Sequence, residues 1–108
     1  MVRVIDQPIW EKQTLTLVNT SDIYDVGRCY GGSFQLEWGI SNSGGTARLE
    51  ASLDKVMWST IPETECTVTP TADSILWNLG KINYPYIRLY FQVGDPTEVT
   101  ARIYMKGG

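Results

Sequence analysis

The chain has 108 residues, of which twelve are acidic and nine are basic, so its formal net charge at neutral pH is -3. A chain of this length fits one domain that can bury a sizeable core without a metal ion or a disulfide to hold it together. A mildly acidic balance does not favour a phosphate backbone or an anionic membrane surface as a partner. Binding to nucleic acid or to membranes is therefore not expected.

The opening residues lack the apolar core of a secretory signal peptide, and no apolar run reaches transmembrane length. We therefore expect a soluble protein that is made in the cytoplasm. Cys29 and Cys66 lie far apart and belong to no CxxC or Cys/His spacing, so a structural zinc site is not indicated. The ordinary behaviour of buried cysteine favours reduced thiols. A disulfide between the two is the alternative that the spacing leaves open.

Residues 1–11 are predicted to form an N-terminal arm, followed by a single β domain over residues 12–108. In the arm, Pro8 interrupts strand pairing just before Ile9 and Trp10. These two apolar residues either cap the domain's own core or pack against a neighbouring subunit. We take packing against a neighbour as the hypothesis to test.

Alternation of apolar and polar residues predicts about eight short strands and no amphipathic helix. After the arm, strands are expected over residues 12–19, 23–26, 33–40, 46–53, 56–61, 65–69 and 75–79, ahead of a long closing segment. The strands over 33–40 and 46–53 are predicted to form a hairpin through a glycine-rich turn. The pattern is typical of an all-β protein, an antiparallel β-sandwich or jelly roll, with a closed barrel as the alternative.

The closing segment, Tyr84 to Gly108, is predicted to form a long antiparallel hairpin around a Gly-Asp-Pro-Thr turn. Its apolar residues share one face and are expected in the core, namely Ile87, Leu89, Phe91, Val93, Val99, Ala101, Ile103 and Met105. Tyrosines and arginines occupy the opposite face. That second face is the part of the hairpin that we expect to carry function.

The chain has no histidine, which removes the commonest general base and the commonest transition-metal ligand. Its carboxylates lie at predicted turns or on outward strand positions, where solvated charge is the expected role. The glycine pairs that begin at Gly31 and Gly44 precede strands, so they have no helix N-terminus with which to bind phosphate. No catalytic, cofactor-binding or metal-binding residue is predicted, and the protein is not expected to be an enzyme.

Aromatic residues are the strongest remaining signal. Trp38 and Trp77 lie on apolar strand faces and are expected in the core. Tyrosine and arginine are enriched in protein interfaces. We predict a protein interface formed by Ile9, Trp10, Trp58, Tyr84, Tyr86, Arg88, Tyr90, Arg102 and Tyr104. The alternative is that a second sheet packs over the tyrosines and arginines.

Two segments of the sequence have distinctive patterns. The first, residues 49–62, contains a Ser-x-Asp-x-x-x-Trp pattern at 52–58. The second is the Tyr-Pro-Tyr-Ile-Arg strand of residues 84–91, together with the terminal residues 100–107, which end in Lys-Gly. Together these segments resemble small β-sandwich virion proteins of tailed bacteriophages. The same strand patterns are similar to those of discoidin-like sandwiches and the carbohydrate-binding modules built on them.

The phage resemblance implies a non-enzymatic virion protein, made in the host cytoplasm, that binds other virion proteins, the major capsid protein in particular. The apolar arm with Trp10 and the face of tyrosines and arginines predict that the chain also forms a homo-oligomer. A capsid decoration or cement protein is favoured over a tail or fibre component, because the chain is one small domain without a fibre shaft. The discoidin-like resemblance implies a glycan as the partner, with Trp58, Tyr86 or Tyr90 stacked on a sugar ring.

Overall fold

The computed structural model describes residues 4–107, which form eight β-strands and no helix. The strands are β1 (Val4–Thr20), β2 (Tyr24–Asp25), β3 (Cys29–Trp38), β4 (Gly45–Ser52), β5 (Ser59–Thr60), β6 (Cys66–Val68), β7 (Asp73–Leu79) and β8 (Tyr86–Gly107). Every pairing between them is antiparallel. The predicted all-β class is confirmed, and this part of the chain contains no helix that could cross a membrane.

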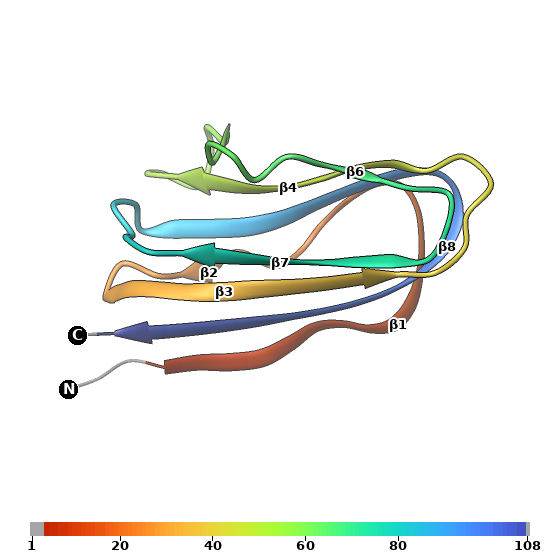
Figure 1. Cartoon of the computed structure of the whole chain (residues 1–108). Helices are drawn as coiled ribbons and strands as arrows, with labels where there is room; N and C mark the ends of the chain where they lie inside the picture. Colours follow the sequence, from red (N-terminus) through yellow and green to blue (C-terminus); the bar gives the residue numbers. More distant parts are fainter. Residues whose placement is uncertain (1–3, 108) are drawn as a thin grey trace.

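Strand β8 organises the fold because it belongs to both layers of the sandwich. Its first half, up to Val93, pairs with β4 on one side and with β2 and the end of β1 on the other. Its second half, from Thr97, pairs with β1 and, from Val99 onward, also with β3. Figure 1 shows β8 curving from one layer to the other at the end of the molecule opposite the two termini. The antiparallel sandwich formed in this way matches the predicted fold class.

The predicted closing hairpin is wrong, because β8 is one strand of 22 residues that bends near Gly94. The strand β1 runs beside it in both layers and supplies the ladder partners that a hairpin would have used. At the bend, the Gly94 N–H donates to the Gly44 carbonyl at 3.3 Å. The inward alternation continues in phase through Val93, Thr97 and Val99, which have exposed fractions of 0%, 1% and 0%.

The predicted hairpin between β3 and β4 is also wrong. Strand β3 pairs with β7 and β8, whereas β4 pairs with β5, β6 and β8. The connection between them crosses from one layer to the other and ends at Gly44, which has φ +68°. Gly45 approaches β8 so closely that a Cβ would lie 1.7 Å from the Gln92 carbonyl oxygen. Residues 35–37 and 48–50, which would face each other in the predicted hairpin, therefore lie in different layers.

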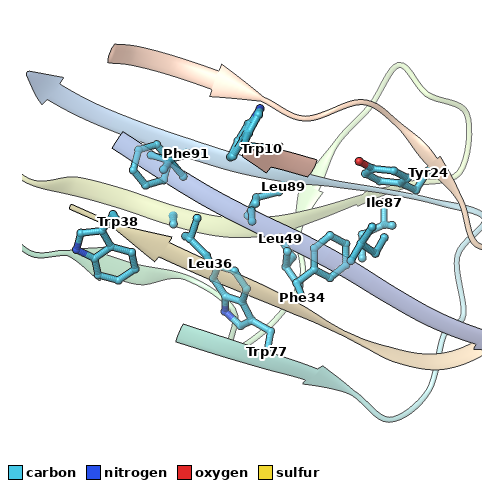
Figure 2. Packing of buried hydrophobic residues seen from close by; sticks show 14 of the residues in the cluster. Trp10, Tyr24, Phe34, Leu36, Trp38, Leu49, Trp77, Ile87, Leu89 and Phe91 are labelled. Atoms are coloured by element: carbon cyan, nitrogen blue, oxygen red, sulfur yellow. The ribbon is translucent and has the colours of Figure 1, made fainter. Parts of the chain in front are cut away.

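The core contains the residues that the alternation placed there. Those with an exposed fraction of 0% include Phe34, Leu36, Leu49, Leu89, Phe91 and Ile103, and Figure 2 shows how several of them pack. Trp38 and Trp77 are also buried, as predicted. Each indole N–H has a partner, since Trp77 Nε1 donates to the Thr64 carbonyl at 2.8 Å and Trp38 Nε1 donates to the Thr71 carbonyl at 3.1 Å.

The predicted N-terminal arm is instead the first part of β1, paired with the second half of β8. The Trp10 ring is 8% exposed and meets the Phe91 ring edge to face at 6.2 Å, as Figure 2 illustrates. Ile9 packs against the same core. A register shift directly after Pro8 accommodates the missing backbone donor. The alternative in which these residues cap their own core is therefore correct, while residues 1–3 of the predicted arm lie outside the described residues.

Two leucines that the alternation placed inward are exposed. Leu15 is buried as predicted, but Leu17 is 67% exposed. The register with β8 shifts between them, and Leu17 adopts φ +59°. Leu53 is 75% exposed because β4 ends at Ser52 and the chain leaves the sheet there. Both differences arise where the strand is irregular, and strict alternation assumes a regular strand.

Cys29 is buried and Cys66 is half-buried, and no disulfide joins them in the part of the chain that the structure describes. Burial raises the pKa of the Cys66 thiol, so its neutral form is favoured. Among residues 4–107, no group of three or more His, Cys, Asp or Glu side chains is arranged to hold a metal ion.

Candidate protein-contact site

The structure divides the nine predicted interface residues among three places. Four lie on the outer face of the layer formed by β4 and the first half of β8, with a fifth at its border: Trp58, Tyr86, Arg88 and Tyr90, then Tyr84. Arg102 and Tyr104 lie on the outer face of the other layer. Trp10 belongs to the core, and Ile9 packs against it. The tyrosines and arginines are separated because the outward residues of β8 point in opposite directions in its two halves.

A charged cluster on the outer face of β4 and β8 surrounds the carboxylate of Glu50, which is only 5% exposed. Arg48 Nε donates to Glu50 Oε2 at 3.1 Å, and Arg88 Nε donates to Glu50 Oε1 at 2.8 Å. Each carboxylate oxygen thus has a guanidinium partner, which compensates for the loss of water around the charge. The expectation that Glu50 is a solvated outward charge is wrong, because these two arginines cover it. We call Arg48, Glu50 and Arg88 the Glu50 cluster.

Three aromatic rings of the predicted interface each have a cation over them. The pairs are Arg48 over Tyr90 at 3.8 Å, Arg88 over Trp58 at 4.1 Å, and Lys55 over Tyr86 at 4.7 Å from cation to ring centroid. Such contacts stabilise the cation by the negative face of the ring. They also connect the loop that follows β4 to the sheet, because Lys55 and Trp58 belong to that loop.

The loop of residues 53–58 is held in shape by its own polar groups. The Asp54 carboxylate accepts the backbone N–H groups of Val56 at 2.8 Å and Met57 at 2.9 Å. The Ser52 hydroxyl accepts the Asp54 N–H at 3.2 Å. The Met57 and Val56 N–H groups lower the pKa of Asp54, because they stabilise its charged form. The strand predicted here is consequently limited to the two residues of β5.

This loop presents three apolar side chains to solvent, with exposed fractions of 75% for Leu53, 79% for Val56 and 75% for Met57. Leu53 and Met57 also border a hollow of about 300 Å³ whose wall includes Ala51 and Tyr84. Exposed large apolar groups that cluster together mark surfaces that contact other molecules. We call Leu53, Val56 and Met57 the apolar loop surface. Sequence reasoning missed it by extending β4 and β5 into the loop.

The two sequence segments that carry the phage resemblance meet at this site. Trp58 of the first segment packs on Arg88 of the second. Ser52 of the first lies opposite Tyr86 of the second in the register of β4 with β8. Tyr84 is half-buried beside the hollow, and burial raises the pKa of its hydroxyl. Residues 49–62 and 84–91 therefore form one structural unit.

The outer face of the second layer is less strongly tied together. Arg102 makes an exposed ion pair with Asp6 at 3.1 Å. Tyr104 is 45% exposed, and Tyr30, which the sequence did not single out, is 51% exposed. Both tyrosines border a hollow of about 360 Å³. The Lys106 ammonium lies 5.7 Å from the centroid of the Tyr30 ring.

Comparison with known proteins gives a match in structure alone. No protein-family model and no curated protein sequence matches the chain. Among solved structures, the chain is similar to the SPBc2 prophage-derived protein YomS, with a TM-score of 0.59 and 9% identity over 96% of this chain and 95% of that one. The Yersinia pseudotuberculosis-derived mitogen has a TM-score of 0.43 and 11% identity over 97% of this chain and 85% of its own. The similarity to YomS shows a common all-β fold.

Proposed function

We propose that the chain is a non-enzymatic structural protein of a tailed-bacteriophage virion, and that it decorates the capsid by binding the major capsid protein. The observation that carries this proposal is the end-to-end similarity of its fold to a prophage-derived protein. The resemblance of residues 49–62 and 84–91 to small virion β-sandwich proteins supports the same assignment. A tail or fibre component is the alternative position within the particle.

The apolar loop surface is the part of the chain that we assign to capsid binding. Its three side chains are among the most exposed large apolar groups of the described residues. The hydrogen bonds of Asp54 fix the loop before any partner arrives, so binding costs little further conformational entropy. Burying such side chains in a protein interface stabilises the complex through the hydrophobic effect. Lys55, which belongs to the same loop, supplies a charged group at the border of this surface.

Immunogold labelling of purified tailed-phage particles, with antibodies raised against the purified chain, tests this assignment. Gold on the capsid supports the decoration role. Gold confined to the tail supports the virion assignment but contradicts the capsid position. Particles from a culture that expresses the gene, if they contain no trace of the chain by immunoblot, contradict the virion assignment altogether.

Glycan binding is the second candidate function. The three rings selected from the sequence are poor stacking surfaces, because each already has a cation over it. The hollow between Tyr30 and Tyr104 is a better candidate, since Ser33 and Asn78 line it and can hydrogen-bond to sugar hydroxyls. A glycan array with the chain and its Tyr104→Ala variant distinguishes the functions. Glycan binding that the variant loses supports this candidate, and an array without signal removes it.

A further inference from the structure

Strand β7 is an edge strand with few of the features that usually prevent edge pairing. It stands at one end of the strand order, and among the described strands it pairs with β3 alone. Its register with β3 is unbroken from Asp73 to Leu79, so it has no bulge. It also contains no proline, lysine or arginine. Proteins commonly use such residues and bulges to keep exposed edges from pairing with another chain.

Strand β1 also has one unpaired edge, since within residues 4–107 it pairs with β8 alone, but that edge is irregular. It contains Pro8 and Lys12, and its register with β8 shifts at three points. Lys12 and Leu17 both have positive φ, at 47° and 59°. The two long edges of the molecule therefore differ. The edge of β1 has irregularities that oppose pairing, whereas β7 keeps an unbroken register with β3.

The side chains of β7 complement one another when two copies are aligned antiparallel about Leu76. That register puts Leu76, which is 56% exposed, opposite Leu76 of the other copy on the outward face. On the same face Ser74 lies opposite Asn78, and a hydroxyl can hydrogen-bond to an amide across such a pair. On the inward face half-buried Ile75 lies opposite Trp77. Every apolar residue in the central five positions meets an apolar partner.

We propose that two copies of the chain pair through β7 to form a two-fold dimer with one continuous sheet across the interface. The strand's one charged residue, Asp73, then lies opposite Leu79 of the second copy, so like charges are not brought together. The Ser74 N–H already donates to the Asp73 carboxylate at 2.8 Å. In the dimer, further backbone groups on the unpaired edge of β7 gain ladder partners, and the two Leu76 side chains leave water. This dimer does not depend on the virion assignment.

Sedimentation equilibrium from about 10 μM to about 1 mM protein, a range that detects weak association, tests the proposal. We expect a reversible monomer–dimer equilibrium for the chain and at least a tenfold weaker dimer for Leu76→Lys. The matched control is Leu17→Lys, at an exposed leucine on the irregular edge of β1, and it should dimerise like the parent. A parent that stays monomeric throughout overturns the proposal, as does a dimer that Leu17→Lys weakens and Leu76→Lys does not.

Cross-linking tests the register and does not depend on how well the lysine variant folds. Opposed residues in antiparallel strands lie at Cα separations that a disulfide can span. Leu76→Cys should therefore form a covalent dimer on mild oxidation, seen on a non-reducing gel, while Leu17→Cys and the parent should not. Leu76→Cys that stays uncross-linked under these conditions contradicts pairing about Leu76.

Discussion

The Arg88 guanidinium donates to the buried Glu50 carboxylate at 2.8 Å, across the register that joins β8 to β4. The same guanidinium packs against the face of the Trp58 ring, which belongs to the loop that follows β4. One arginine thus connects the sheet, a buried acid and the loop that carries the apolar loop surface. The stability of the site should depend on this acid more than on any exposed charge around it.

Replacing Glu50 with alanine leaves Arg48 and Arg88 partly buried without their carboxylate. Removal of one partner from a buried charge pair is strongly destabilising, so we expect Glu50→Ala to lower the free energy of unfolding by roughly 2 to 4 kcal/mol. The control is Glu65→Ala. Glu65 is exposed and lies 3.5 Å from Arg48, and its loss should cost at most about 0.5 kcal/mol. Equal urea midpoints for the two variants would contradict this account of the cluster.

Leu89→Ala should cost about 2 to 5 kcal/mol of unfolding free energy, because the leucine is fully buried and its truncation leaves a cavity. Gln35→Ala should cost far less, since Gln35 is exposed on an outward position of β3. Urea denaturation of both variants provides the measurement. Similar losses would mean that the strand faces are assigned incorrectly.

Trp10→Ala should cost about 3 to 5 kcal/mol, because the indole packs in the core against Phe91. Val4→Ala, at a 54% exposed residue of the same strand, is the control and should change stability by at most about 0.5 kcal/mol. A Trp10→Ala variant with the parent's thermal midpoint would restore the arm hypothesis. This outcome can be read from a single pair of melting curves.

The Asp54 carboxylate should make the loop sensitive to acid. Its folded-state pKa is held below the ordinary value of 3.8, first by the Met57 and then by the Val56 N–H. A depressed pKa contributes stability above the unfolded-state value, and that contribution is lost as the pH falls through the folded-state pKa. Asp54→Ala should therefore be less stable than the parent at pH 7, with the difference shrinking below about pH 4. An NMR titration of the Asp54 carboxyl with a midpoint at or above 3.8 would be inconsistent with these hydrogen bonds.

The faces of β8 could be predicted from alternation, but its path could not. The Gly94 to Thr97 stretch has turn residues, and a turn motif is equally compatible with a hairpin reversal and with a strand that bends between two layers. The sequence did contain one relevant signal, which is that the apolar alternation has the same phase before and after this stretch. The buried positions are odd-numbered both from Ile87 to Val93 and from Thr97 to Met105, so the two halves stay in phase across the bend. Only the pairing with β1, which is distant in sequence, decides between the two paths.

The arrangement of the candidate site could be predicted only in part, because the sequence selected several residues that lie together but did not reveal their neighbours. Trp58, Tyr86, Arg88 and Tyr90 do gather on one face. The burial of Glu50 depends on arginines contributed by two strands, which a local pattern cannot reveal. The exposure of Met57 depends on hydrogen bonds that stop β4 from continuing. The burial of Glu50 results from contacts between residues distant in sequence, and the exposure of Met57 results from an irregular loop. Neither is visible in a local sequence pattern.

The proposed function requires that the apolar loop surface attach the chain to a phage capsid. Purified chain should co-sediment with tailed-phage particles that were assembled without it, and Met57→Asp should weaken this binding at least tenfold, about 1.4 kcal/mol. Ile40→Asp is the matched control, because Ile40 is 79% exposed and its connection lies at the other end of the molecule from the loop, as Figure 1 shows. Ile40→Asp should bind like the parent. A parent that stays in the supernatant, or two variants that bind equally well, would contradict this attachment.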